Sequence, residues 1–568
     1  MQTNMKKLSL IAALALVSLA AQAQTWQDAM LFSENNYVGT ARSVGMGNAV
    51  TALGGDAGSI GFNPAGSAVA GYSQFVMTPA LSISSAYATG TIYEGWDAPV
   101  GFQDGVSSGF TRFKMPNIGA ITSFNTGSRS GLRRISMGFV MNSTNDFTQR
   151  FNASGVNRDN SFAAALASLA DGYATSVMSN ESWYATGDPA RMPSWISMTG
   201  YRSGMMDAVD GNDGAYVAAT ERMDDSGNFR LAGPINQRYG RQSTGSKNDY
   251  ILNFAADFSD VFYIGANIGI VSLRYRQNEY WQESPEDPST FPTIGYSDGT
   301  TRQFRQLIMK RAYRASGSGI YAKAGFLWRP FDGLRLAAAI STPTVIDIEE
   351  RYGYEGETHY NSGVISASSP EDEWFYQLRS PFRVNAGLAY TIGSVASLSA
   401  DYEFTNYSHA RYRAVDEEGY EIYDDATFAD VNADIRDLCG AQHILRLGGE
   451  LRPTPQLAIR VGYNYITSPQ HAEFRGGQVV LLNEDEYRER SRTNVSFGFG
   501  YSSAGSFFLD GALRFNFMPF EYIIPYDYYT VPAGAQFYNK VADASVPVPE
   551  ISMKSTLIDV LVTCGWRF

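Results

Sequence analysis

The sequence predicts an all-β fold: a transmembrane antiparallel β-barrel of about fourteen strands with a small N-terminal hatch inside its lumen. Three observations carry this prediction. Many segments alternate apolar and polar residues, long and short connections follow one another in turn, and an export signal precedes a compact glycine-rich stretch. The chain has 568 residues, a length that one large barrel can use as a single unit.

The first 23 residues have the composition of a cleaved export signal. Lys6 and Lys7 form a positive end, residues 8–20 form a short apolar core, and residues 21–23 provide a small-x-small cleavage site. We therefore expect the mature chain to begin at Gln24. The apolar core is too short to span a bilayer, and no Cys follows the cleavage site, which argues against a lipid anchor.

The composition narrows the class of protein. Beyond the export signal, no run of 18 or more apolar residues occurs, so no helical membrane span is predicted. The 35 Tyr, 33 Phe and 55 Gly residues favour strands, tight turns and the aromatic girdles of barrels. The formal net charge of −13 makes nucleic acid an unsuitable partner.

Fourteen segments have the length and pattern of strands. In the segment 505–520, Phe507 and Leu509 share one face while Asp510 and Arg514 share the other. An apolar outside with a polar or small inside is the pattern of a barrel in lipid. A soluble β-sandwich shows the same alternation with its apolar face turned inward, so periodicity alone cannot separate the two. The predicted strands are 71–88, 117–126, 132–146, 249–258, 261–276, 313–329, 333–351, 376–391, 395–409, 441–452, 455–467, 491–503, 505–520 and 553–568.

The lengths of the connections distinguish these two folds. Six tight turns, such as the pair Ser259-Asp260, alternate with seven long connections. Outer-membrane barrels have short periplasmic turns and long external loops, whereas a sandwich has no reason to collect every long connection at one end. The long connections are 89–116, 147–248, 277–312, 352–375, 410–440, 468–490 and 521–552.

The last predicted strand adds to the case for the outer membrane. Its outward positions are apolar and it ends on Phe568, which resembles the signal read by the outer-membrane assembly machinery. That machinery is therefore an expected partner. Cys439 and Cys564 map to opposite ends of the barrel, so we predict two free thiols.

Two of the long loops have a character of their own. The loop 147–248 is too long to be structureless, and Phe162, Leu166, Leu169 and Tyr173 mark one helical stripe within it. The loop 410–440 is rich in Asp and Glu. Its carboxylates could share divalent cations with lipopolysaccharide, or they are simply solvated.

Residues 24–70 do not have the pattern of a strand. They contain Gly45 and Gly47 in the stretch Gly-Met-Gly-Asn-Ala, and we expect one short helix around 46–53. They end on Asn63-Pro64-Ala65-Gly66, which requires a fixed turn. Because this stretch directly precedes the first strand, we place it at the periplasmic mouth, inside a wide lumen.

These motifs resemble the N-terminal hatch of the FadL/TodX family, the outer-membrane transporters of long-chain fatty acids and aromatic hydrocarbons. The resemblance covers the hatch, the strand number and the termini. It implies passive uptake of hydrophobic compounds such as long-chain fatty acids. It also implies a hatch that gates the lumen, residues 24–28 as a mobile plug that begins at Gln24, and a sideways exit through the wall. The chain departs from the family in its very long second external loop.

Candidate ligand-binding residues follow from the strand register. Arg446, Arg460 and Arg514 point inward and could receive a carboxylate. The alternative is that they pair with inward acids such as Asp401, Glu403, Glu450 and Asp510. The apolar stripe that begins at Phe162 and Leu166 is a further candidate contact for a hydrophobic ligand.

Several other functions remain open at this point. A branch of the same family resembles a component of type IX protein secretion and shares the hatch motif. Haem capture by the four His residues, which map to loops and strand rims, is a weaker alternative. No catalytic motif is recognised, so we expect no enzyme activity, no cofactor and no metal. The hatch disfavours a general porin.

Overall fold

The computed structural model describes residues 24–92, 96–180, 193–209, 212–225, 227–295, 301–416, 426–475, 478–526 and 548–568. The predicted export signal lies outside these residues. So does the centre of the acidic loop, residues 417–425.

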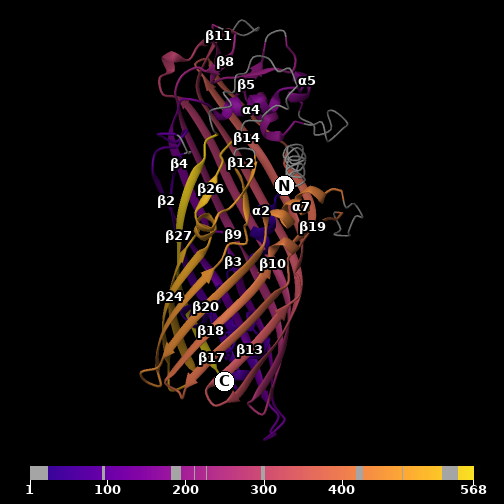
Figure 1. The fold of residues 1–568 in the computed structure, drawn as a ribbon, viewed down its shortest axis with the longest axis vertical. Helices are drawn as coiled ribbons and strands as arrows, with labels where there is room; N and C mark the ends of the chain where they lie inside the picture. The colour runs from indigo at the N-terminus through magenta and orange to yellow at the C-terminus, as the bar shows by residue number, and fades with distance from the viewer. Residues whose placement is uncertain are drawn as a thin grey trace, which may run out of the picture.

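Fourteen antiparallel barrel strands close on themselves (Figure 1). The first strand, β1 (Gln74–Gly90), pairs with the last, β27 (Ile551–Arg567), and this pairing completes the ring. The predicted architecture and strand number are thus confirmed. Three strands are each broken once into two pieces: β13 (Leu334–Ser341) with β14 (Val345–Tyr360), β16 (Asp372–Arg379) with β17 (Arg383–Ile392), and β18 (Ala396–Asn406) with β19 (Arg411–Ala414). The other barrel strands are β2 (Val106–Asn125), β3 (Leu132–Asp146), β9 (Ile235–Phe258), β10 (Phe262–Pro285), β12 (Thr301–Phe331), β20 (Ala441–Leu451), β21 (Leu457–Ile466), β24 (Arg492–Ser502) and β25 (Phe507–Phe517).

A belt of apolar side chains surrounds the lower half of the barrel. On β10, Ile264, Ile268 and Ile270 are 42–50% exposed, whereas the alternate residues Asn267 and Val271 are 2–3% exposed. An apolar outside on a closed barrel is the surface that lipid tails cover, and every backbone group within it is paired in the ladder. We call this surface the apolar belt. Aromatic residues mark its lower edge: Phe262, Trp328, Tyr390, Tyr501 and Trp566.

Short turns and long loops occupy opposite ends of the barrel. The turn between β9 and β10 has Ser259 and Asp260 at φ 62° and 56°, the left-handed pair that a two-residue hairpin needs. The C-terminus lies at this end, and the helices and long loops gather at the other (Figure 1). This arrangement agrees with the alternation of loop lengths in the sequence.

Several strands extend much further than predicted, and β2, for one, begins at Val106 where we expected residue 117. β9 begins at Ile235 where we expected residue 249, and β12 begins at Thr301 where we expected 313. β10 likewise continues to Pro285. Beyond the apolar belt no lipid covers the outward face of these strands, and their inward face mixes polar side chains, such as Gln237, with apolar ones, such as Leu307, that pack on the cap. The alternation that identifies a strand in sequence is therefore lost there.

Smaller elements cover the upper end. α4 begins after Ser161, whose hydroxyl caps the backbone amide of Ala164, and Phe162 stacks on Trp281 with ring centroids 5.3 Å apart. Among the described residues, no helix combines the length and the apolarity that crossing a bilayer would need. The helices of this end are α4 (Phe162–Ala170), α5 (Thr175–Met178), α6 (Trp195–Arg202), α7 (Ala429–Leu438) and α8 (Glu484–Glu489), with 3-10 turns η4 (Pro288–Thr290) and η5 (Tyr407–His409). The short strands are β4 (Gln149–Asn157), β5 (Met206–Ala208), β6 (Tyr216–Ala218), β7 (Glu221–Met223), β8 (Phe229–Leu231), β11 (Thr293–Gly295), β15 (Gly363–Ser368), β22 (Ala472–Arg475), β23 (Gln478–Leu481) and β26 (Glu521–Ile523).

Both cysteines are free, as the strand map predicted. Cys439 is buried directly after α7 at the upper end. Cys564 lies on the outward face of β27, close to the C-terminus. The described chain therefore carries no internal covalent bridge between its two Cys residues.

Candidate functional site

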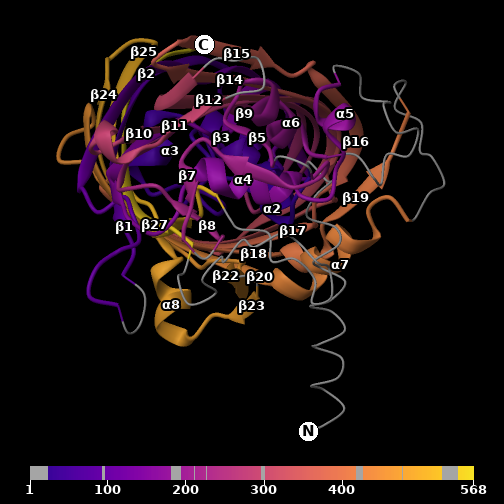
Figure 2. The same cartoon turned by 90° about the horizontal axis from the view of Figure 1, so that it is seen from above.

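The lumen is filled by the N-terminal residues, seen inside the ring of strands in Figure 2. We call residues 39–70 the hatch core and residues 24–38 the N-terminal segment. The hatch core contains α3 (Ala41–Gly45), η1 (Ala57–Gly61) and η2 (Pro64–Val69). The helix expected at 46–53 is thus misplaced. Gly47 and Asn48 adopt left-handed φ values of 62° and 56°, which end α3 before that stretch.

Asn63 holds the predicted hatch turn in place. Its side-chain oxygen accepts a hydrogen bond from the Ala65 amide at 3.1 Å, which caps η2. Its side-chain nitrogen donates to the carbonyls of Thr51 and Phe326, both at 3.0 Å. Pro64 then opens the 3-10 turn without needing an amide hydrogen. One side chain therefore joins the turn, the rest of the hatch core and strand β12.

Glycines of the barrel wall let the hatch core approach the wall backbone. A Cβ added at Gly462 would lie 2.0 Å from the Gly47 nitrogen, and one at Gly448 would lie 2.4 Å from the Met46 carbonyl oxygen. A Cβ at Gly498 would lie 3.1 Å from the Gly45 Cα. Further glycines in such contact with the hatch core are Gly265, Gly325 and Gly387. Backbone thus packs directly on backbone, and the hatch core has no room to shift.

The three inward arginines lie in ion pairs around the hatch core. Arg446 pairs with Glu403 at 2.8 Å, and Arg460 lies 2.7 Å from Glu450. Arg460 also pairs with Asp510 at 2.6 Å. Arg514 pairs with Asp559 at 2.7 Å and donates to the carbonyl of Tyr37 at 2.9 Å. This is the acid pairing that the sequence offered as the alternative; a role in binding a ligand carboxylate stays a prediction.

The N-terminal segment is attached through polar contacts and through the buried side chains of Trp26, Ala29 and Phe32, which pack on the wall. Its helix α2 (Trp26–Ser33) starts with a capping box between Thr25 and Asp28. The Gln24 side chain donates to the Glu350 carboxylate at 2.9 Å, and Glu350 also accepts the hydroxyls of Tyr313 and Tyr376. Glu350 lies above the apolar belt. Burial raises the pKa of this carboxyl to about 7, and the nearby charge of Asp28 adds to the rise.

The N-terminal segment also completes the wall beside β3. The pairing of β2 with β3 stops at Asn117 and Asn142, so the next carbonyls of β3 lack a strand neighbour. The amide of Val38 donates to the Ser143 carbonyl at 2.8 Å, and the amide of Asn36 donates to Thr144 at 2.6 Å. Residues of the N-terminal segment therefore take the place that β2 leaves.

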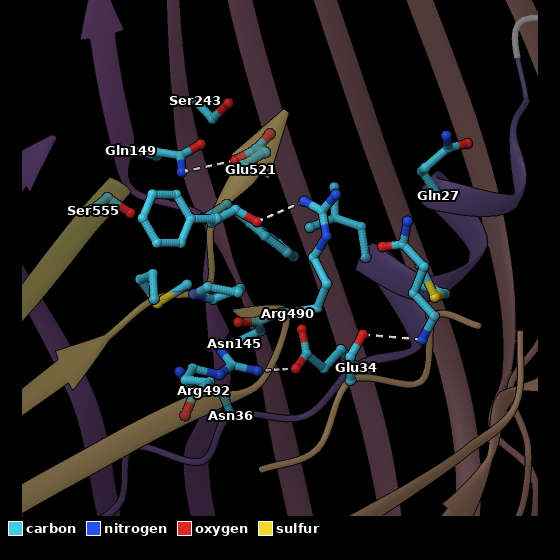
Figure 3. A pocket seen from close by; sticks show the side chains of 18 of the residues that line it. Gln27, Glu34, Asn36, Asn145, Gln149, Ser243, Arg490, Arg492, Glu521 and Ser555 are labelled. Carbon is cyan, nitrogen blue, oxygen red and sulfur yellow. Dashed lines mark hydrogen bonds and ion pairs between the residues drawn. The ribbon is translucent and has the colours of Figure 1, made fainter. Parts of the chain in front are cut away.

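A cavity of about 590 Å³ lies between α2 and the wall (Figure 3). Two ion pairs lie at its lining, Arg492 with Glu34 and Arg241 with Glu521. Arg490 also lines it and donates to the Phe520 carbonyl at 2.8 Å. The apolar lining includes Trp26, Met30, Leu31, Phe147, Met518, Phe520 and Ile523. An apolar lining with a few fixed polar groups suits a hydrophobic or amphipathic ligand.

The candidate residues of the external loop lie elsewhere. Phe162 and Leu166 are 1–2% exposed and belong to the apolar core of the upper cap, away from the lining of this cavity. A direct ligand contact by either residue stays a prediction. Within the described ranges, no group of three or more His, Cys, Asp or Glu side chains is placed to hold a metal ion.

Sequence reasoning missed most of the residues that line the cavity. Trp26, Phe147 and Arg492 come from the N-terminal segment, the end of β3 and the start of β24, which are far apart in the chain. No local pattern joins them. The contact of the hatch core with the wall is visible in the sequence, because inward glycines recur on several strands where the hatch core packs.

Comparison with known proteins gives similarity at the level of structure only. No family model matches the chain, and no curated protein matches it. A FadL homologue of Pseudomonas aeruginosa is 13% identical over 94% of this chain and 98% of that chain, with a TM-score of 0.46. The toluene transporter TbuX of Ralstonia pickettii is 12% identical over 95% and 100%, with a TM-score of 0.44. The toluene transporter TodX of Pseudomonas putida is 11% identical over 94% and 99%, with a TM-score of 0.45.

Proposed function

We propose that the protein is an outer-membrane transporter for the passive uptake of hydrophobic compounds, and that its N-terminal segment is the gate. The observation that carries the proposal is the 590 Å³ cavity, which α2 covers and which lies beside the incomplete edge of β3. The long loops face the outside and the C-terminus faces the periplasm. Gln24 does not lie at the periplasmic mouth, where we expected it, but inside the lumen at the level of Glu350, above the apolar belt. No bond is made or broken in this role.

Long-chain fatty acids are the proposed substrate class. Burial contributes about 0.8 kcal/mol per methylene, so a long acyl chain binds in an apolar cavity without directional contacts. The guanidinium of Arg490 at the lining is suited to the carboxylate end. Because binding needs no energy source, transport runs down the concentration gradient.

The tight contact of the hatch core indicates where the ligand leaves. A route through the hatch core would require its backbone to separate from the glycine wall. A shift of the N-terminal segment leaves the wall backbone in place. It breaks the hydrogen bonds of Gln24, Asn36 and Val38, the ion pair of Glu34 with Arg492, the bonds that Lys247 donates to the carbonyls of Phe32 and Glu34, and the packing of Phe32. That shift uncovers the edge of β3 and opens a sideways path toward lipid.

Deletion of residues 24–28 tests the gate. We expect uptake of a labelled long-chain fatty acid at low concentration to fall at least fivefold, because the cavity loses Trp26 and the Gln24 contact. Heat-modifiable migration on a gel should stay unchanged, since the barrel ladder is complete without these residues. Uptake at the wild-type rate would refute the gate. Normal uptake with loss of exported surface proteins would favour the secretion branch.

The substrate class has its own test in Arg490→Gln. Uptake of a fatty acid should fall severalfold while uptake of an alkane of the same length stays within twofold. An equal effect on both compounds would show that Arg490 does not recognise the carboxylate. The proposed substrates would then be neutral hydrocarbons.

A further inference from the structure

Cations lie side by side on the outer wall above the apolar belt. In the ladder, Arg276 of β10 is directly opposite Arg314 of β12, which is directly opposite Arg351 of β14. Arg274 follows on the same face of β10, two residues nearer the belt. Like charges directly opposite on adjacent strands are destabilising. We call Arg274, Arg276, Arg314 and Arg351 the arginine row.

The acids nearby neutralise only one member of the row. Arg351 pairs with Glu349 and Glu373, each at 2.6 Å. Arg274, Arg276 and Arg314 are exposed, and within the part of the chain that the structure describes none of them has an ion pair or a side-chain hydrogen bond. Three exposed guanidinium groups therefore face outward with their donors open to an external anion.

The arginine row lies above the apolar belt, within side-chain reach of the polar layer of a membrane. On β10 the apolar belt ends at Ile270, and the outward residues that follow are Ser272, Arg274 and Arg276. Arg274 lies four residues beyond Ile270, about 13 Å of strand, and Arg276 lies six residues beyond it, about 20 Å; the tilt of barrel strands reduces these to roughly 10 Å and 15 Å along the membrane normal. The headgroup layer is about 5–8 Å thick on each side. Long arginine side chains can reach into that layer while their stems lie on the wall.

A groove of about 740 Å³ adjoins the row on the side away from the belt. Its floor contains Ala312 and Gly353, which are partners in the ladder and leave space above the strands. Arg150, Lys310 and Arg314 stand around it, together with two carboxylates, Glu371 and Glu355, the second of which lies 4.0 Å from Lys310. The wall thus offers cations within reach of the headgroup layer and a polar recess directly above them.

We propose that this face binds the phosphorylated headgroup of an outer-leaflet glycolipid such as lipopolysaccharide. Arg274, Arg276 and Arg314 hold its phosphates, its sugars occupy the groove, and its acyl chains lie on the apolar belt below. The planar guanidinium fork matches two phosphate oxygens at once, and charge-assisted hydrogen bonds of this kind are strong. The site rests on the proposed outer-membrane placement and is independent of the transport path.

The test is a triple variant, Arg274→Gln, Arg276→Gln and Arg314→Gln. The matched control is Arg158→Gln, Arg230→Gln and Arg305→Gln, which removes the same charge from exposed positions at the same end. Binding of bis-phosphorylated lipid A in detergent micelles is measured by native mass spectrometry. We expect affinity to fall at least tenfold in the triple variant and to stay within twofold in the control. Equal affinity in the triple variant and the wild type would overturn the proposal.

Three further measurements identify the ligand. Dephosphorylated lipid A should bind at least tenfold more weakly to the wild type, and equal binding would overturn the role of the phosphates. Inorganic phosphate at the same concentration should not displace the lipid, and displacement would assign the row to free phosphate. A chelator of divalent cations should leave binding unchanged, because release would assign it to carboxylates bridged by metal. Fatty-acid uptake by the triple variant should stay at the wild-type rate, which separates this site from the gate.

Discussion

The hatch core and the N-terminal segment lie in the same lumen, but the wall holds them in different ways. The hatch core meets glycines on several strands, and its backbone packs on the wall backbone at Gly448 and Gly462. The N-terminal segment meets the wall through side chains, such as the contact of Gln24 with Glu350 and the packing of Phe32 on Tyr275, and a cavity lies beside it. The difference teaches that backbone packing holds one part of the plug and side-chain contacts hold the other, and that the cavity borders the second, which is the part that the proposed gate uses.

The most direct way to test this comparison is to cross-link each part to the wall. In a Cys439→Ser, Cys564→Ser background, Val38→Cys and Ser143→Cys join bridge partners, so a short link can form there. We expect the oxidised link to reduce uptake to background and reduction to restore it. The control joins the hatch core to the wall through Ala41→Cys and Thr563→Cys and a short thiol cross-linker.

In that control, uptake should stay within twofold of the unlinked variant. Loss of uptake with both links would mean that the whole hatch moves. Loss with the second link alone would reverse the assignment of the fixed and moving parts.

A clash at the glycine wall tests the fixed part. Gly448→Val places a branched side chain where the Met46 carbonyl lies, and such overpacking costs about 1–3 kcal/mol. We expect faster hydrogen exchange throughout residues 39–70. Gly449→Val is the matched control, because its nearest neighbours are side chains of Leu398 and Val461 at 3.6 Å on the outer face. Slow exchange in both variants would show that the hatch core has room to adjust.

Removal of the Asn63 amide should have a smaller effect. Asn63→Ala leaves two carbonyls and one amide without their partner, and a lost buried hydrogen bond costs about 1–3 kcal/mol. With Pro64→Ala added, uptake should depart from the wild-type rate while the barrel still assembles. Heat-modifiable migration measures assembly. An uptake rate equal to that of the wild type would remove the hatch turn from the transport path.

The smallest expected effect is a dependence of the gate on pH. The pKa of Glu350 is raised to about 7 when Gln24 is docked, so the docked state binds more protons than a hydrated, released state. The stability of docking is therefore fully present below the ordinary carboxyl pKa of about 4.5 and decreases as pH rises toward 7. Spectroscopy with a label at Gln27→Cys should show a severalfold larger released fraction at pH 8 than at pH 5. Glu350→Gln should abolish this difference, and a difference that persists would assign it to Asp28.

The fold was predictable where lipid imposes a pattern. Strands such as β25 alternate because lipid covers Leu509 and Leu513 while Asp510 and Arg514 face the interior. Beyond the apolar belt that constraint ends, and the predicted starts of β9 and β12 fell short of the observed ones. The alternation of apolar and polar residues thus identifies the part of each strand that lipid covers, not the whole length of the strand.

The site was predictable only in part. The pairing of Arg460 with Glu450 and Asp510 was among the alternatives, because these residues share inward faces of nearby strands. Asp559, the partner of Arg514, was not, although the two are direct neighbours in the ladder. The cavity could not be predicted, because its lining exists only once the barrel closes around α2.

The close contact between hatch core and wall also constrains the order of assembly. The amide of Ala41 bonds to Thr563 on the last strand, and strands between the first and the last contribute glycines to the same fitted surface. A plug that fits so closely cannot be threaded into a finished cylinder. It must already be folded, or fold together with the strands, when β27 joins β1. The last strand to form then also completes the wall surface on which the hatch core packs. Closure of the barrel therefore depends on a hatch core that is already in place.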